Sequence, residues 1–288
     1  MNSPDRRLTL DADSVINGVR RLPSLPAVIV ELLHSLDDEH ANARRLARDL
    51  ARDPALAARI LRTANSSFYG CQRKVLTLDD AFAVLGLQGV RSLAIAATMR
   101  NTLSFRHRGS PGEWNFNAFW RHSVAVALAA RGIAQCYRSR ESHAFAAGLL
   151  HDVGRLALAS CFPEHAAAVV RARTADDESW LPVEQRVLGI DHASIGRVLA
   201  EHWQFPKLLT QTIGSHHAPD PAADDLVSLV HVADWLGHAV ERTRERHRSV
   251  GAPPGVAGDF HPLAADEWTS LAETVAGQLD AACAAFTT

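Results

Sequence analysis

Apolar residues recur at helical spacing along almost the whole of this chain. In PALAARILRTAN, residues Leu56, Ile60 and Ala64 are four apart, which places them on one face of a helix. The strict alternation of apolar and polar residues that is typical of a half-buried strand is scarce. Alanine, leucine and arginine, which favour helices, are plentiful. The pattern therefore predicts an all-α protein.

Residues that begin and end helices support this prediction. Asp53 followed by Pro54 is a typical N-cap with a first-turn proline. Thr77 with Asp80 three residues later resembles a capping box, with Asp in place of Glu or Gln. Gly86 is expected to end the helix that this box begins.

The segment RHRGSPGEWN interrupts the helical pattern with glycine, proline and charge. Such composition is typical of a connection between domains. We therefore expect a smaller N-terminal helical part over residues 1–107 and a larger helical domain over residues 108–288. No short repeat suggests a solenoid.

Composition narrows the classes of protein. The chain has 288 residues, 47% of them hydrophobic, which is enough for a full core. The net charge of -2 disfavours a general nucleic-acid binder. The four cysteines include no C-x-x-C pair, so neither a thiolate zinc site nor a redox motif is expected. Because neither a signal peptide nor a bilayer-spanning apolar run is visible, we expect a cytoplasmic protein with no membrane partner.

Ionisable residues lie inside several of the apolar helical patterns. His122, Asp152, His192 and Asp234 each fall on a core-facing stripe, with Asp152 placed inside one helix with its flanking leucines. Buried charges and imidazoles cost free energy unless they are paired, and a divalent metal could pair several at once. A lone buried histidine is more often a satisfied core residue, but buried aspartate is rare without a partner. Together these four ionisable residues favour a metal ion that they bind in common.

The remaining histidines carry weaker signals. The adjacent pair His216 and His217 would point about 100° apart on a helix, but at a helix end both could reach a metal. Three others fall on helices and are interpreted as core or surface residues, and seven are predicted to lie on the surface. The three on helices are His202, His231 and His238. The seven predicted on the surface are His34, His40, His107, His143, His165, His247 and His261.

The second part resembles the HD superfamily of metal-dependent phosphohydrolases. His122, His151–Asp152 in GLLHDVGRL and Asp234 in VHVADWL match the H…HD…D signature of that family. The resemblance implies an HD-like helical bundle in which these four residues bind one metal.

Two further segments are similar to the HD-GYP branch of that superfamily. They are DHASIGRVL and SHHAP, which supply His192, His216 and His217. The resemblance implies that these three histidines hold a second metal, with Asp152 bridging the two ions.

The first part resembles the front of the HDOD family, the HD-related output domain of bacterial signalling proteins. Residues 53–66 carry D-P-x-L-x-x-x-I-L-x-x-x-N-S, and residues 81–86 carry A-x-x-x-L-G. WQFP at residues 203–206 also fits, so the resemblance covers most of residues 22–240. It implies a regulatory output module without established phosphodiesterase activity.

Departures from the HD-GYP pattern support that implication. Arg155 replaces a lysine, and Ala118 stands where a glutamate can supply a third metal ligand. The paired histidines are followed by residues 218–220 (Ala-Pro-Asp), with no E-x-x-D-G-x-G-Y-P loop, so cyclic dinucleotide binding is not expected.

Together these observations predict a bacterial signal-transduction module that acts through protein–protein interaction with signalling partners. Its site would bind one or two divalent ions, and imidazole with carboxylate suits Fe, Mn, Zn or Ni. The alternative is a metal-dependent phosphohydrolase with Asp152 and Arg155 in catalytic roles. A third alternative, a helix-turn-helix in the arginine-rich segment at residues 43–62, is disfavoured because Asp49 and Asp53 balance its charge. The sequence names neither the partner nor the oligomeric state.

Overall fold

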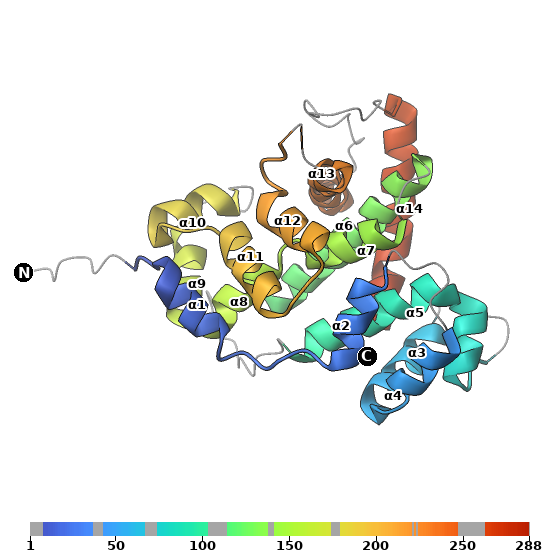
Figure 1. The fold of residues 1–288 in the computed structure, drawn as a ribbon. Helices are drawn as coiled ribbons and strands as arrows, with labels where there is room; N and C mark the ends of the chain where they lie inside the picture. Colours follow the sequence, from blue (N-terminus) through green and yellow to red (C-terminus); the bar gives the residue numbers. More distant parts are fainter. Residues whose placement is uncertain are drawn as a thin grey trace, which may run out of the picture.

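The computed structural model describes residues 8–36, 43–66, 74–102, 114–137, 141–173, 179–220, 222, 224–246 and 263–287. All regular structure in these ranges is helical (Figure 1), which confirms the all-α prediction. The helices are α1 Ala12–Val19, α2 Ala27–His34, α3 Ala43–Leu50, α4 Pro54–Ala64, α5 Leu78–Thr102, α6 Phe116–Cys136, α7 Glu141–Leu150, α8 Val153–Cys161, α9 Pro163–Ala172, α10 Trp180–Leu188, α11 His192–His202, α12 Lys207–Ser215, α13 Asp225–Arg246 and α14 Ala265–Thr287.

The predicted caps are confirmed. The Asp53 side chain accepts a hydrogen bond from the Leu56 backbone N–H at 3.0 Å at the start of α4. The Asp80 carboxylate accepts the Thr77 N–H at 2.9 Å while the Thr77 hydroxyl accepts the Asp80 N–H at 3.0 Å, the reciprocal pattern of a capping box. Gly86 breaks the helix as predicted, with φ 69° and ψ 173°, but the chain resumes as helix at once, so α5 is kinked there.

The core is built around α6. This helix packs against α7, α13 and α14, while α8 packs against α11 and α11 against α12 (Figure 1). Every residue from Ser123 to Ala130 on α6 is buried. A helix that is apolar on all sides is stable only when other helices cover all of it, so α6 is the axis on which the others are arranged.

The N-terminal segment reaches across the molecule. Helix α1 packs against α8 and α11, and the Trp203 indole N–H donates to the Pro23 carbonyl at 3.1 Å. The predicted division at residue 107 remains a prediction, because residues 103–113, which include most of the proposed connection, lie outside the described residues.

Two glycines allow α8 and α11 to cross closely. A Cβ atom at Gly154 would overlap the carbonyl oxygen of His192 and would lie 2.5 Å from the backbone nitrogen of Gly196. Backbone atoms cannot rotate away as a side chain can, so only a glycine fits here. The crossing holds the start of α8 against the start of α11, and both ends carry residues of the predicted site.

One surface prediction is wrong among the described residues; His40, His107, His247 and His261, also predicted on the surface, lie outside them. His143 is buried, with 7% of its surface exposed, because α7 lies in the core between α6 and α13. Its polar flanks in the sequence, RSRES, reflect the connection before the helix rather than the environment of the helix itself.

No single helix within the described ranges has the length and apolar character needed to cross a membrane. One bent pair, His143–Cys161 with Pro163–Ala172, meets the length and composition criteria together.

Candidate metal centre

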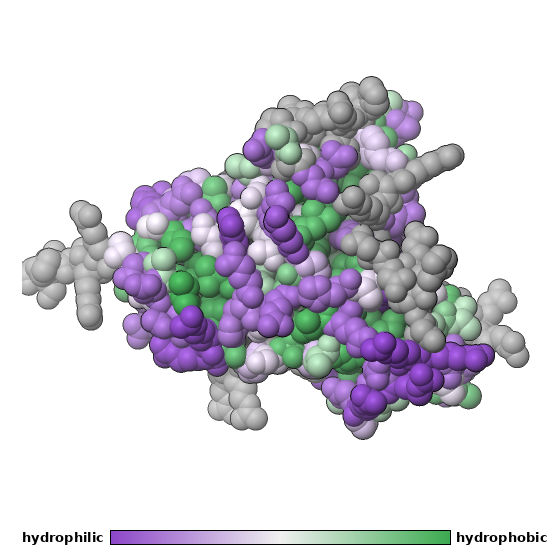
Figure 2. Space-filling model, viewed as in Figure 1, coloured by the Kyte–Doolittle hydropathy of each residue, from purple (hydrophilic) through white to green (hydrophobic). Residues whose placement is uncertain are grey.

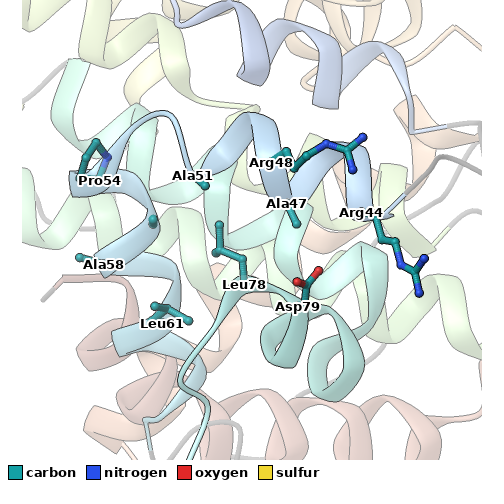
Figure 3. Close-up of a pocket in the computed structure, with 10 residues that line it drawn as sticks. Arg44, Ala47, Arg48, Ala51, Pro54, Ala58, Leu61, Leu78 and Asp79 are labelled. Atoms are coloured by element: carbon teal, nitrogen blue, oxygen red, sulfur yellow. The ribbon is translucent and has the colours of Figure 1, made fainter.

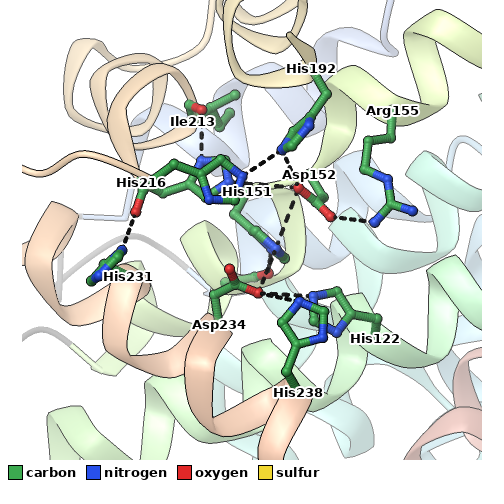
Figure 4. Close-up of polar contacts among 12 residues, drawn as sticks. His122, His151, Asp152, Arg155, His192, Ile213, His216, His231, Asp234 and His238 are labelled. Atoms are coloured by element: carbon green, nitrogen blue, oxygen red, sulfur yellow. Dashed lines mark hydrogen bonds and ion pairs between the residues drawn. The ribbon is translucent and has the colours of Figure 1, made fainter. Parts of the chain in front are cut away.

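The seven residues predicted to bind metal lie together in overlapping groups in one region of the interior. Figure 4 labels six of them, all except His217. Six are buried, and His217 is half-buried. They come from five places in the fold: His122 from α6, His151 and Asp152 from the junction of α7 and α8, His192 from the first residue of α11, His216 and His217 from the end of α12, and Asp234 from α13.

The chain breaks at His151 and Asp152, so the expectation of one continuous helix through this motif is wrong. Helix α7 ends at Leu150 and α8 begins at Val153. Asp152 occupies the N-cap position of α8 with φ -96° and ψ 14°, yet its side chain makes no capping hydrogen bond. The carboxylate instead contacts His192 of α11 and His216 at the end of α12.

Asp152 lies at the middle of the site. Its Oδ1 atom is 3.0 Å from His192 Nε2 and 3.6 Å from both His151 Nε2 and His216 Nε2. Its Oδ2 atom accepts a hydrogen bond from Arg155 Nη1 at 2.9 Å. Burial raises the pKa of this carboxyl, but the adjacent His151 and His192 outweigh burial and hold the pKa well below its usual range. Asp152 is therefore an anion with one oxygen turned toward three imidazoles.

Two of these imidazoles have nitrogen atoms without a partner. His151 Nδ1 donates to the Gly148 carbonyl at 2.7 Å, and His216 Nδ1 donates to the Ile213 carbonyl at 2.9 Å. Each Nε2 is buried and has no hydrogen-bond partner among the described residues. An unpaired buried polar atom costs about 1–3 kcal/mol. A metal would satisfy both atoms, and a backbone carbonyl on the far nitrogen is how metal-binding histidines are commonly oriented.

His192 is oriented by a carboxylate that the sequence analysis missed. Glu184 on α10 is buried and accepts both the His192 Nδ1–H at 2.6 Å and the His192 backbone N–H at 2.8 Å. The other nitrogen, Nε2, faces Asp152 and lies 2.8 Å from His217 Nε2. Burial lowers the pKa of His192, but Glu184 and Asp152 outweigh burial and raise the pKa to about 10. Burial and the neighbouring imidazoles lower the pKa of His217 to about 2.

His122 is held in a similar way on the opposite side. Its Nε2 lies 3.0 Å from Asp234 Oδ1 and its Nδ1 lies 3.2 Å from Glu241 Oε2. Burial lowers the pKa of His122, but these two carboxylates raise the pKa to about 10. The carboxylates that raise the pKa of His122 and His192 are also groups whose negative charge a bound divalent cation could balance.

Helix α13 contributes more than the predicted Asp234. His238 Nε2 lies 3.5 Å from Asp234 Oδ1 and its ring stacks on His122 at 4.2 Å, while 45% of its side chain is exposed. His231 Nδ1 donates to the His216 carbonyl at 2.7 Å. The spacing of His238 and Glu241, four and seven residues after Asp234, is a sequence signal that could have identified them, because such positions share a helix face. Glu184 had no such signal.

The possible ligand atoms form three groups. Within each group the ligand atoms lie within 4.8 Å of one another, and two of the groups share Asp152. Imidazole and carboxylate donors in this number fit a divalent transition metal. The groups are His122, His151 and Asp152; Asp152, His192, His216 and His217; and His122, Asp234 and His238.

Arg155 is not free to approach a ligand. In addition to its bond to Asp152, its guanidinium lies 4.1 Å from the centre of the Trp180 ring, and Arg173 lies 4.0 Å from the centre of the same ring. Arg155 is buried. In this geometry the guanidinium holds the Asp152 carboxylate in place.

The cap of α11 positions His192 and gives a direct prediction. Asp191 accepts the Ser194 N–H at 2.8 Å and the Gln185 side-chain N–H at 3.0 Å. Replacing Asp191 by alanine is expected to lower the free energy of unfolding by about 1 kcal/mol, because an N-cap bond is lost. Urea unfolding followed by circular dichroism measures this. Asp191→Asn is the control, since asparagine caps equally well; an equal loss in both variants would contradict the capping role.

Comparisons with known proteins agree with this fold. A sequence model of the HDOD domain matches residues 22–219. A structure named "Putative phosphohydrolase" from Shewanella amazonensis SB2B is 26% identical, with 95% of this chain and 98% of that chain covered and a TM-score of 0.71. A "Putative signal transduction protein" from Marinobacter aquaeolei VT8 is also 26% identical, with 95% and 63% covered and a TM-score of 0.68.

Two further relatives are more distant. An HDOD domain protein with unknown function from Geobacter sulfurreducens is 22% identical, covers 96% of this chain and 98% of its own, and has a TM-score of 0.67, which shows likeness of fold. An uncharacterized protein of Treponema pallidum (strain Nichols) is 23% identical over 222 residues. That match covers 76% of this chain but 42% of the relative, so this chain spans less than half of its length.

Proposed function

The chain belongs to the HDOD domain family, and on that premise we propose that it is a regulatory module of bacterial signalling whose buried His/Asp centre binds divalent metal. One observation carries the metal proposal. His151 Nε2 and His216 Nε2 are buried without a partner, and both lie 3.6 Å from the same oxygen of Asp152. Three groups that can each contribute a lone pair therefore face one small volume, which favours a cation there.

Two observations support the regulatory role over catalysis. Arg155, the cation nearest the site that could bind a phosphate, is buried against Trp180 and bonded to Asp152. A 26% identical structure also carries the name "Putative signal transduction protein". Bound metal then links residues from five parts of the fold, and the fraction of the protein that carries metal sets the free energy of unfolding of the module.

The metal proposal is tested by loading the purified chain with Fe(II), Mn(II), Zn(II) or Ni(II) in turn and measuring bound metal by elemental analysis. We expect one or two ions per chain and a higher melting temperature, because a ligand at 100 times its Kd stabilises the folded state by about 2.7 kcal/mol. His216→Ala should lower both values, and the matched control His202→Ala, at an exposed position on the neighbouring α11, should not. Binding of none of the four metals would refute the proposal.

A phosphohydrolase is the second candidate, favoured by the two ligand groups that share Asp152. Two-metal hydrolases use such a shared carboxylate, and bound metal supplies a hydroxide nucleophile at neutral pH. In this chain Asp152, His192 and His122 would hold the metal ions, and His238, with 45% of its side chain exposed, is a more accessible member of the ligand groups. The 26% identical structure named "Putative phosphohydrolase" agrees with this candidate. Turnover of phosphoesters by the metal-loaded chain, lost in Asp152→Asn, would favour it over the regulatory role.

A further inference from the structure

A groove lies far from the metal centre, between α3, α4 and the start of α5. Its volume is about 620 Å³, and its walls are mostly small or apolar, including Ala51, Ala58, Leu61 and Leu78 (Figure 3). Alanine side chains leave a shallow floor on which larger apolar side chains of another molecule could pack. The groove is therefore shaped for apolar contact rather than for a network of hydrogen bonds.

Two unpaired cations mark one end of this groove. Arg44 and Arg48, one turn apart on α3, line the groove at the end opposite Pro54 and Ala58 (Figure 3). Both are exposed, and neither makes an ion pair or side-chain hydrogen bond with any described residue.

The other arginines of this region behave differently. Arg45 pairs with Glu31 at 2.7 Å and with Asp49 at 3.7 Å, and Arg52 pairs with Asp49 at 3.4 Å. Figure 2 shows the strongly hydrophilic surface over α3 at the lower right of the view. Of the four arginines on α3 and in the turn after it, the two that line the groove make no ion pair with a described residue, while the other two pair with Asp49.

Two exposed large apolar residues also lie close to the groove residue Leu78 in the sequence. Leu76 and Val84, which are 66% and 50% exposed, are the large hydrophobic residues with high exposure among those described, and both lie within six residues of Leu78. Asp79 lines the α5 wall and is exposed without an ion pair among the described residues. An occupant would therefore carry its acidic groups on the α3 side and not against α5.

We propose that this groove binds an acidic amphipathic helix of a partner protein. Two cations one helical turn apart match two carboxylates one turn apart on a facing helix, since both pairs repeat at about 6 Å. The apolar face of such a helix would pack on the alanine floor, as in other helix-in-groove complexes. Phosphates of a nucleic acid could contact Arg44 and Arg48 but would gain nothing from Ala51, Ala58 and Leu61. This inference rests on the proposed regulatory role, for which it supplies the partner surface.

The test uses the full chain as bait for a phage-displayed library of 16-residue peptides, followed by fluorescence anisotropy with the most enriched peptide and with a DNA duplex. We expect enriched peptides to be amphipathic helices with two acidic residues one turn apart. Affinity should fall at least ten-fold in the double variant Arg44→Glu/Arg48→Glu and in the groove-filling variant Ala58→Trp. The control Arg52→Glu reverses one arginine outside the groove, which is half the charge change of the double variant, and should stay within two-fold of wild type.

Other outcomes would overturn the inference. One is that the library yields no selectively enriched peptide. Another is that the enriched peptide binds the groove variants as tightly as wild type. A third is that the DNA duplex binds, and Arg44→Glu/Arg48→Glu abolishes this binding, while no peptide binds. Circular dichroism of each variant checks that it is folded. Because none of these substitutions touches the metal centre, metal content measured on the same samples should remain at the wild-type value. A result that contradicts peptide binding in the groove can then be distinguished from a result that contradicts metal binding.

Discussion

Replacing Asp152 by asparagine is expected to lower the metal content of the loaded chain at least ten-fold. Asp152 is the residue shared by two of the ligand groups, and its Oδ1 faces the imidazoles of His151, His192 and His216. Loss of even an outer partner of a metal ligand typically costs about 10–100-fold in metal affinity, so loss of a shared anionic ligand should cost at least as much. Elemental analysis after loading and desalting measures the effect.

The matched control for this prediction is Asp220→Asn. Asp220 is exposed five residues from the end of α12, and its carboxylate accepts one backbone N–H within its own turn. The same change of charge there should leave the metal content unaltered. Equal metal content in wild type and Asp152→Asn would mean that any bound ion lies elsewhere and that the histidines are ordinary core residues.

Replacing Gly154 by alanine is expected to destabilise the protein by at least about 3 kcal/mol, the upper part of the range for overpacking a tight core. The added methyl group would overlap the His192 carbonyl and the Gly196 backbone. Relief requires α8 and α11 to separate, and that movement would also pull Asp152 away from His192. The free energy of unfolding and the metal content should therefore fall together.

Gly277→Ala is a control in which the free energy of unfolding is expected to change in the opposite direction. Gly277 lies in α14, is exposed, and has no atom within 4 Å of the position that a Cβ would take. Alanine favours the helix over glycine by up to about 1 kcal/mol, so this variant should be more stable than wild type. If both variants shifted stability in the same direction, the close crossing of α8 and α11 would not be the cause.

Several features followed from the sequence because their causes are local. The caps at Asp53 and at Thr77 with Asp80 depend on side chains three residues apart, and their bonds form as predicted. Burial of His122 and Asp234 followed from helical periodicity, since a polar residue on an apolar stripe must enter the core with that stripe.

Predictions failed where the neighbours are distant in sequence. His143 was expected on the surface because of its polar flanks, but α7 carries it into the core. Glu184 was missed because no periodic relation links α10 to His192; only the turn before α11 brings the carboxylate to the imidazole. The contact of Arg155 on α8 with Trp180 on α10 likewise joins residues of different helices, and the catalytic role of Arg155 in the phosphohydrolase alternative stays a prediction.

Local sequence patterns were enough to establish that the chain is helical, where α4 and α5 begin, and that His122 and Asp234 are buried. These properties depend on spacing within one turn or one helix face. Tertiary packing was needed to show that imidazoles from three segments meet around one oxygen of Asp152, with two of their nitrogen atoms unpaired. Convergence of that kind depends on how helices cross, and crossings such as that of Gly154 with Gly196 are set by packing between residues far apart in the chain.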